Sequence, residues 1–460
     1  MVWMRVALCV LLLGLGSACG TDPDGKETRP HVLLVLVDTL RFDRVGAYGA
    51  DRPTTPNIDL VANSGVRFER AYSPAPWTKP AAASILTGLY PSTHGATSVP
   101  ARISDEATTL AEILSAEGYA TLGVVSGSNV SSVYGFDRGF DHWDESQIRG
   151  GEAFTSLQVT DRALAFAREA IRSGRPFFLF VHYFDPHYIY RHHPKVGFSP
   201  ERAGRLDGSE GIHELRRIGR DASAEEIEFL RARYDEEIRV TDATFGRLME
   251  GLEALGVAQQ NLILVITADH GEEILERGWL GHTRTLYEEL LRVPLIVRAP
   301  GRVRPGHVVA QPVSTVALTP TILDWLGLEA PDDSLQAESL AALAAGGQED
   351  PDAQVLGEVD FETGGPAQTV RNAFKKALIG ARFKLIRDDP TGRYELYDLR
   401  ADPKEQRDLA ADEPARVRAL VPVLEQRLAR IRGPEGPVRS VELDEEQREA
   451  LRRLGYLGED

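Results

Sequence analysis

Residues 31–37 read HVLLVLV and are followed directly by Asp38. A continuous apolar run rich in β-branched residues is typical of a strand buried on both faces, as the strands of parallel sheets are. In an open α/β sheet, ligands bind beyond the carboxyl ends of the strands. The polar residues that follow such runs, Asp38 first among them, are therefore candidates for a functional site.

Other segments repeat this pattern and alternate with helical ones. Apolar strand candidates are Thr121–Val125, Pro176–His182, Leu262–Thr267 and Val293–Arg298. Helix candidates between them are Pro56–Asn63, Ala81–Leu86, Thr108–Ser115, Val159–Ile171, Ala224–Leu255 and Val316–Leu326. This alternation predicts an α/β fold with a mainly parallel sheet sandwiched by helices.

A change of pattern divides the chain near residue 340. The segment 341–354 reads AALAAGGQEDPDAQ and is typical of a linker. After it come shorter strand-like segments and a charged helix around Glu413–Arg432. We therefore predict a large α/β domain over residues 31–340 and a smaller C-terminal domain over residues 355–460, built from an antiparallel sheet and a helix.

One strand end and one helix start carry residues suited to catalysis. Asp269 and His270 directly follow the run Leu262–Thr267, and a carboxylate beside an imidazole can bind one metal ion. Thr78 stands at the start of a helix rich in small residues, where free N–H groups favour an oxyanion. A hydroxyl bound to a divalent cation loses its proton more easily and can act as a nucleophile. For Asp38, Thr78 and Asp269, an ordinary cap or turn is the alternative role.

A second group follows the run Pro176–His182. It consists of Asp185 and His187 in the sequence FDPH (184–187), together with His282 in GHTRTLYEE (281–289). A carboxylate and two imidazoles can form a second metal site or bind substrate oxygens. Stabilisation of loops is the alternative role for these three side chains.

Taken together, the segments resemble the sulfatase branch of the alkaline phosphatase superfamily, over nearly the whole chain after its first 30 residues. The segments that carry the resemblance are HVLLVLVDTLRFDRVGAYG (31–49), RPTTPNIDLVANSGVRFERAYS (52–73), PAPWTKPAAASILTGLYPSTHG (74–95), YGFDRGFD (134–141), ITADHGEE (266–273), LYEELLRVPLIVRAPG (286–301), LTPTILDWLGL (318–328), YELYDLRADPKEQRDLA (394–410) and LRRLGYL (451–457). The resemblance implies an alkaline-phosphatase-like domain, a C-terminal sulfatase subdomain and a metal-dependent hydrolase of sulfate or phosphate esters.

The chain departs from the sulfatase pattern at the reacting positions. Sulfatases carry Cys or Ser in a Cys/Ser-x-Pro-x-Arg stretch, and oxidation of that residue gives formylglycine. Here Thr78 takes its place and Ala82 replaces the Arg, so no formylglycine is expected. Thr39 stands where a second Asp is usual, and the Gly-Lys-Trp-His stretch is missing. These features resemble the phosphodiesterase and phosphoethanolamine-transferase branches, which pair a Thr nucleophile with Asp and Asp-His ligands.

The resemblance therefore implies a metal ion held by Asp38, Thr78, Asp269 and His270, with Thr78 as the nucleophile. An imidazole ligand favours Zn²⁺ or Mn²⁺, and Ca²⁺ stays an option. Phosphoesters are favoured over sulfate esters, and the substrate is expected to be a small-molecule, glycan or lipid ester. Two alternatives are a transferase that moves a phospho-headgroup onto envelope lipid or glycan, and a non-catalytic binding protein on a decayed sulfatase scaffold.

Composition and the N-terminus indicate where the protein works. With 52 basic and 69 acidic residues the net charge is −17, which argues against nucleic acid as a partner. The cysteines, Cys9 and Cys19, leave the rest of the chain without a disulfide or a thiolate nucleophile. The sequence specifies no oligomeric state.

Residues 1–19 resemble a bacterial lipoprotein signal. The apolar run Val6–Leu15 is too short to span a bilayer, and small residues directly precede Cys19. Residues 20–30 are polar and suited to a flexible tether. We expect export, lipidation of Cys19 and a place in the cell envelope, periplasmic or at the outer membrane, with the lipid as the only membrane contact. A secretory signal cut after Ala18 is the alternative.

Overall fold

The computed structural model describes residues 29–148, 154–331, 335–362, 372–431, 433 and 439–457. The expected signal peptide, Cys19 and most of the tether lie outside the described residues. Within the described ranges, no helix is both long and apolar enough to cross a membrane.

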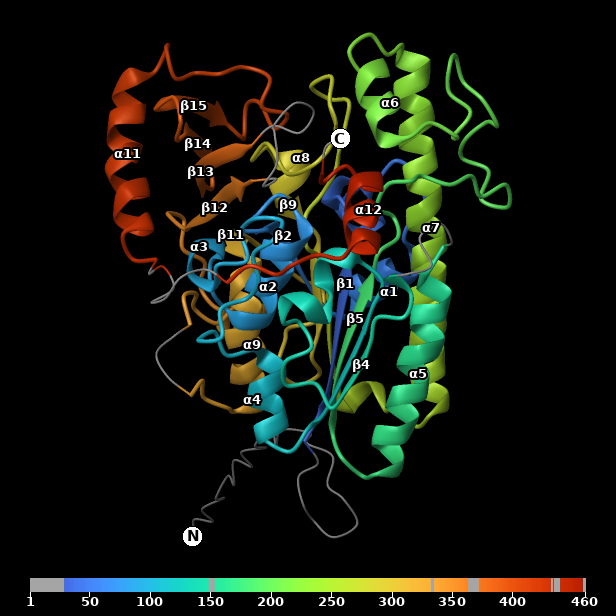
Figure 1. Cartoon of the computed structure of the whole chain (residues 1–460). Helices are drawn as coiled ribbons and strands as arrows, with labels where there is room; N and C mark the ends of the chain where they lie inside the picture. Colours follow the sequence, from blue (N-terminus) through green and yellow to red (C-terminus); the bar gives the residue numbers. More distant parts are fainter. Residues whose placement is uncertain are drawn as a thin grey trace, which may run out of the picture.

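A nine-stranded sheet forms the centre of the molecule (Figure 1). Its strands are β1 (His31–Val37), β2 (Val66–Tyr72), β3 (Ala120–Val125), β4 (His142–Asp144), β5 (Phe177–Tyr183), β6 (Leu262–Ala268), β9 (Arg292–Val293), β10 (Leu295–Arg298) and β11 (His307–Ser314). They run in the order β11-β2-β10-β6-β1-β5-β3-β4, with β9 beside β2. Strand β1 is parallel to β5 and β6, whereas β10 is antiparallel to both its neighbours. The prediction of a mainly parallel sheet is confirmed.

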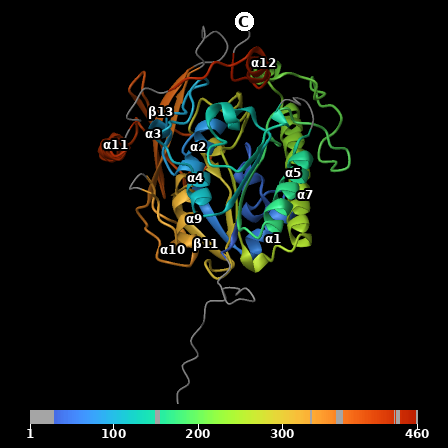
Figure 2. The same cartoon turned by 60° about the horizontal axis from the view of Figure 1, so that its bottom comes forward.

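Helices cover both faces of this sheet (Figures 1 and 2). One face carries α1 (Pro56–Ser64), α5 (Ser156–Arg172) and α7 (Ala224–Ala254), and the other carries α2 (Thr78–Thr87), α4 (Leu110–Ala116) and α9 (Leu318–Leu326). Shorter helices are α3 (Pro91–His94), α6 (Ile212–Ile218), α8 (Glu288–Leu291) and α10 (Ala341–Ala344). Because both faces are covered, β1, β5 and β6 are buried along nearly their whole length, as continuous apolar runs require.

The C-terminal domain is an antiparallel sheet with one helix across it. Its strands are β12 (Gln354–Phe361), β13 (Ala373–Gly380), β14 (Phe383–Asp388) and β15 (Arg393–Asp398), paired in that order. Helix α11 (Pro414–Leu428) buries Leu424 against Leu378 and Leu385 of this sheet (Figure 1). The chain then returns to the large domain as α12 (Glu445–Arg453), which lies over the central sheet near its carboxyl edge (Figure 1).

The structure corrects several local expectations. The segment Val293–Arg298 is not one parallel strand: β9 and β10 are separated at Pro294, which has no N–H to donate, and both are antiparallel to β2. Strands β2 and β11 and helix α12 were not anticipated. The expected linker contains α10, and its Glu349 accepts hydrogen bonds from the backbone of Ala310 and Gln311 in β11.

Candidate metal and nucleophile site

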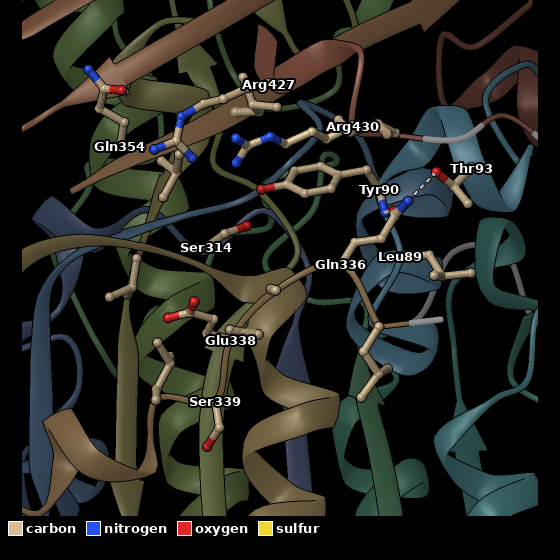
Figure 3. Close-up of a pocket in the computed structure, with 18 of the residues that line it drawn as sticks. Leu89, Tyr90, Thr93, Ser314, Gln336, Glu338, Ser339, Gln354, Arg427 and Arg430 are labelled. Carbon is tan, nitrogen blue, oxygen red and sulfur yellow. Dashed lines mark hydrogen bonds between the residues drawn. The ribbon is translucent and has the colours of Figure 1, made fainter. Parts of the chain in front are cut away.

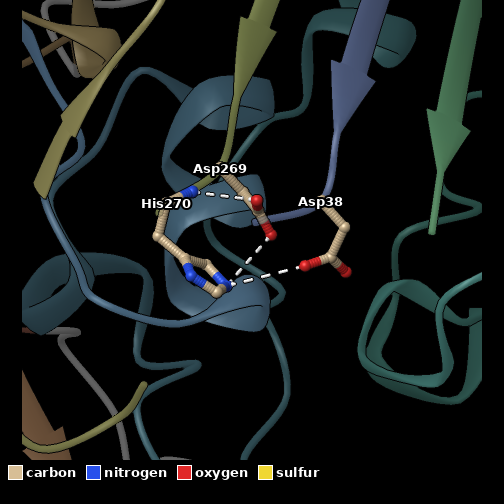
Figure 4. Close-up of side chains that lie close together, drawn as sticks. All are labelled: Asp38, Asp269 and His270. Carbon is tan, nitrogen blue, oxygen red and sulfur yellow. Dashed lines mark hydrogen bonds and ion pairs between the residues drawn. The ribbon is translucent and has the colours of Figure 1, made fainter. Parts of the chain in front are cut away.

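Two aspartates from neighbouring strands meet at the carboxyl edge of the sheet. Val37 of β1 is paired with Ala268 of β6, so Asp38 and Asp269 leave the sheet side by side (Figure 4). Asp269 Oδ1 accepts hydrogen bonds from the backbone N–H groups of Thr39 and His270, at 3.1 and 2.8 Å. The sheet register therefore brings together two residues that are far apart in the sequence.

His270 completes a cluster of three groups that all present lone pairs. Its Nδ1 lies 2.7 Å from the carbonyl oxygen of Gly271, which can only accept, so Nδ1 carries the proton. Its Nε2 then faces Asp38 Oδ1 at 3.7 Å and Asp269 Oδ2 at 3.4 Å. Neither carboxylate oxygen has a hydrogen-bond partner in the structure, and both are buried. Lone pairs converging in this way fit a divalent cation.

The charges of the cluster also favour a bound cation. Burial raises the pKa of the Asp38 carboxyl well above its usual value, and the neighbouring carboxylates of Asp269 and Glu272 raise it further. Burial also raises the pKa of Asp269, although His270 opposes that shift. Without a counter-charge, these carboxyl groups are costly to ionise in place. The cluster of Asp38, Asp269 and His270 can bind a metal ion, which would supply that charge.

Thr78 brings a hydroxyl group to this cluster. It is the first residue of α2, and Trp77 occupies the N-cap position, so Thr78 does not cap its helix. Its Oγ1 lies 3.3 Å from His270 Nε2 and 3.5 Å from Asp38 Oδ2. Its side chain is buried, and the first turn of the helix offers N–H groups and a positive dipole end beside it. The four residues predicted as ligands therefore lie together.

The second predicted group is only partly assembled. Asp185 Oδ2 accepts four hydrogen bonds from the backbone and side chains of Thr155 and Ser156, at 2.6–3.1 Å, and so holds the start of α5. The rings of His187 and His282 lie together, with centroids 5.1 Å apart. Burial lowers the pKa of His187 to about 3 and that of His282 well below its usual value, so both rings are neutral. Whether the imidazoles bind metal or substrate stays a prediction.

Three further residues belong to this neighbourhood and were not foreseen. Buried His182, at the end of β5, has its Nε2 3.5 Å from Asp38 Oδ2. Glu272 Oε1 lies 2.9 Å from His282 Nδ1, and the hydroxyl of Tyr456 lies 3.3 Å from Thr78 Oγ1. Glu272 lies in the motif ADHGEE (268–273), and Tyr456 lies in LRRLGYL (451–457). Both motifs were visible in the sequence, but no rule of spacing predicts that a residue near the C-terminus lies beside Thr78.

The amino group of Lys79, the residue after Thr78, contacts Val99 and Tyr134, so it does not replace the Arg cation that is lost at Ala82. Its Nζ donates to the carbonyl oxygen of Val99 at 2.6 Å and lies 3.6 Å from the ring centroid of Tyr134. Burial lowers the pKa of this amine well below its usual value.

The sequence profile of the sulfatase family matches residues 30–328, which is well over half of the chain. The chain belongs to the sulfatase family. A second profile, N-sulphoglucosamine sulphohydrolase, C-terminal, matches residues 275–433 and so includes the antiparallel sheet and α11. Asp38, Thr78, Asp269 and His270 therefore lie in the part of the chain that the family profile matches, and relatives of the chain are ester hydrolases.

Named relatives span the chain at low identity. An N-acetylglucosamine-6-O-sulfatase of Bacteroides thetaiotaomicron is 24% identical, and the alignment covers 91% of this chain and 90% of the sulfatase. The human N-sulphoglucosamine sulphohydrolase is 26% identical, with 92% of each chain covered. A phosphonate monoester hydrolase of Silicibacter pomeroyi has a solved structure with a TM-score of 0.67, at 23% identity, covering 88% of this chain and 96% of its own; it shares the fold.

A cavity lies away from this site. It measures about 1180 Å³ and lies between the large domain and the C-terminal domain, where Tyr90 and Gln336 face Arg427 and Arg430 (Figure 3). Its lining includes none of the four residues of the metal and nucleophile cluster.

Proposed function

We propose that the protein is a metal-dependent hydrolase of phosphate or sulfate esters in which Thr78 is the nucleophile, with phosphoesters favoured. The observation that carries this proposal is the position of Thr78 Oγ1, within 3.5 Å of both Asp38 and His270 at the start of a helix. A hydroxyl in that position can be activated and can attack an electrophilic phosphorus or sulfur atom.

Asp38, Thr78, Asp269 and His270 would hold the metal ion, and the imidazole favours Zn²⁺ or Mn²⁺ over Ca²⁺. When bound, such an ion supplies positive charge to the reacting oxygens and lowers the pKa of a ligating hydroxyl. The N–H groups in the first turn of α2 favour negative charge on the oxygens of the tetrahedral group. Attack by Thr78 Oγ displaces the alcohol, and water then cleaves the ester formed on Thr78.

Two departures from the sulfatase pattern favour phosphoesters. Threonine cannot give the aldehyde that sulfatases form from Cys or Ser, and Ala82 offers no cation at the usual Arg position. Removing a charged group that stabilises a transition state typically costs a few kcal/mol, and ~1.4 kcal/mol is tenfold in rate. Sulfate esters should therefore be turned over more slowly by several orders of magnitude.

Paired assays on aryl phosphate mono- and diesters and on aryl sulfate test the proposal. Thr78→Ala should abolish turnover, whereas Thr78→Ser should retain part of it, because Ser keeps the hydroxyl. Thr87→Ala is the matched control, since Thr87 lies in the same helix and its hydroxyl bonds only to the backbone of Ala83 and Leu89 among the described residues. Intact mass should show an unmodified Thr78 and a transient adduct of phosphate size.

Four outcomes would count against this assignment. Full activity in Thr78→Ala removes the nucleophile, and sulfate hydrolysis without phosphoester hydrolysis reverses the substrate class. Absence of turnover on every ester, together with tight binding of one of them, would support a binding protein instead. Transfer of the group to an added alcohol in preference to water would indicate a transferase.

A further inference from the structure

The C-terminal segment delivers a tyrosine hydroxyl into the site. After α12 the chain turns at Gly455, and Tyr456 N–H donates to the carbonyl oxygen of Leu451. The Tyr456 hydroxyl lies 3.3 Å from Thr78 Oγ1, 2.7 Å from His282 Nε2 and 3.5 Å from His187 Nε2. The side chain is 1% exposed, so this contact is made in the protein interior.

The hydrogen-bond partners of His282 fix the direction of these bonds. Its Nδ1 lies 2.9 Å from the Glu272 carboxylate, so Nδ1 carries the proton and Nε2 is an acceptor. The single proton of the Tyr456 hydroxyl is therefore donated to His282 Nε2. The lone pairs of Tyr456 Oη remain free to accept a hydrogen bond from Thr78.

This arrangement orients the nucleophile that the proposed function requires. When Thr78 donates its proton to Tyr456, the lone pairs of Thr78 Oγ1 are directed away from Tyr456 and are free for the Asp38–Asp269–His270 cluster. The Thr78 hydroxyl can also donate to Asp38 Oδ2, which lies 3.5 Å from Oγ1, so a fixed acceptor at Tyr456 selects between these orientations and favours the one from which attack can occur.

The same hydroxyl occupies the space where the sequence predicted a second metal ion. His187 Nδ1 lies 2.8 Å from the carbonyl oxygen of Tyr188, so its Nε2 also presents a lone pair toward Tyr456. Asp185 is the third predicted ligand, but it is engaged at the start of α5. Within the described residues, the two imidazoles thus converge on Tyr456 Oη.

Main-chain contacts hold the segment in this position. Arg216 of α6 donates to the carbonyl oxygen of Gly455 at 3.2 Å and to that of Leu280, two residues before His282, at 3.1 Å. Gly455 has a φ of +77°, and a Cβ there would meet Arg216 Nη1 at 2.8 Å. One guanidinium group therefore links the segment after α12 to β8 (Leu280–Gly281), which directly precedes His282.

We propose that Tyr456 is a positioning residue of the active site, which the C-terminal segment supplies and which orients the Thr78 hydroxyl through the Glu272–His282–Tyr456 hydrogen-bond chain. The proposal rests on Thr78 as the nucleophile. It makes the segment that follows α12 part of the site. It also predicts that Tyr456, not a second metal ion, lies between His187 and His282.

Tyr456→Phe tests this directly, because it removes the hydroxyl and keeps the ring that packs near Trp77. With the ester that the wild type hydrolyses best, we expect kcat to fall by roughly 10- to 100-fold and KM to change less than about threefold. Tyr397→Phe is the control, since it removes a hydroxyl bonded to Glu395 in the C-terminal sheet. Metal content should be one ion per chain in all three proteins.

A binding measurement reads the same contact without turnover. Calorimetric titration of inorganic phosphate into the metal-loaded proteins should show at least about fivefold weaker binding in Tyr456→Phe, because a P–OH group bound next to Thr78 Oγ1 can donate to the Tyr456 hydroxyl oxygen, whose own proton goes to His282. Unchanged kcat and unchanged phosphate binding in Tyr456→Phe would overturn the proposal. A rise in kcat/KM would also overturn it, since the tail would then be a plug that blocks the site. Two metal ions per chain would refute the single-metal arrangement.

Discussion

At Asp38 and Asp269, burial favours the neutral carboxyl group, whereas metal binding requires the carboxylate. Burial raises the pKa of both carboxyl groups, so the metal-free protein favours their neutral forms, whereas a metal ion requires the carboxylates. A carboxyl pKa that is higher in the folded than in the unfolded chain contributes stability below the unfolded value, and that stability is lost as pH rises through the folded value. Metal-free protein should therefore lose stability as pH rises through these raised pKa values, and bound metal should restore it.

Asp38→Asn and Asp269→Asn test this balance. Both variants should lose bound metal and activity, while their metal-free forms should melt at or above the wild-type temperature at pH 8, because a buried charge has been removed. Asp242→Asn is the matched control: Asp242 is equally buried, but it accepts from the backbone of Asn57 and Ile58 at α1. Elemental analysis and melting curves at pH 5 and pH 8 check the result. Full metal occupancy in either site variant would exclude that ligand.

A substitution at Asp185 tests whether its carboxylate stabilises the fold or binds a metal ion. Its four hydrogen bonds to Thr155 and Ser156 predict that Asp185→Ala destabilises the protein by about 1–2 kcal/mol or more, as the loss of a helix cap does. Metal content should stay unchanged. The metal content of His282→Ala provides the comparison, because this variant removes an imidazole of the same predicted group. A drop from two ions to one in Asp185→Ala would reinstate the second metal site.

At the scale of the elements, a buried ion triad joins the two domains. Lys384 of β14 is 0% exposed, and its Nζ lies 3.2 Å from Glu288 Oε1 of α8 and 3.0 Å from Glu405 Oε1. Burial raises the pKa of Glu405 to about 7, and Lys384 opposes that shift. The ammonium group thus holds together two carboxylates that would otherwise repel each other across the domain boundary.

Lys384→Met should lower the free energy of unfolding by about 3–5 kcal/mol, because it removes the cation that the buried carboxylates of Glu288 and Glu405 share. The loss should be smaller at pH 6 than at pH 8, since Glu405 can take up a proton at the lower pH. Arg407→Met is the control: Arg407 and Asp412 form an exposed pair, worth at most about 1 kcal/mol. Denaturant titrations at both pH values measure these losses in the free energy of unfolding. Equal losses in Lys384→Met and Arg407→Met would contradict a stabilising role for the triad.

The elements that the sequence predicted well are those whose pattern is set by burial alone. Buried runs such as His31–Val37 and Leu262–Thr267 indicate strands on their own, and the end of each strand fixes Asp38 and Asp269. Strand β2 alternates apolar residues with the partly exposed Arg67 and Glu69, so it lacks that continuous signal. Tyr456 depends on the return of the chain from the C-terminal domain, a tertiary event that no local periodicity encodes.

At the scale of the whole molecule, the point where the chain enters lies opposite the site. Arg29 donates to the carbonyl oxygen of Glu117, and Tyr119 donates to that of Pro30, so the described chain begins at the amino ends of the strands. Strand β1 then runs for seven residues before Asp38, a distance of about 20 Å. The site therefore lies at the opposite end of the central sheet from residue 29, where the described chain begins (Figure 1).

The proposed lipid on Cys19 makes this orientation testable. Cys19→Ala should release the protein from the membrane fraction, whereas Cys9→Ala should not, because Cys9 lies in the apolar run that processing removes. A lipid anchor contributes ~0.8 kcal/mol per buried CH₂, so its loss shifts partition strongly toward the soluble fraction. Because the site lies at the far end of the central sheet from residue 29, we expect kcat/KM for a soluble aryl ester to stay within about twofold of the value for the anchored form. Cys19→Ala that is normally processed yet stays with the membrane would exclude the lipid, and a large change in kcat/KM on release would place the site against the membrane instead.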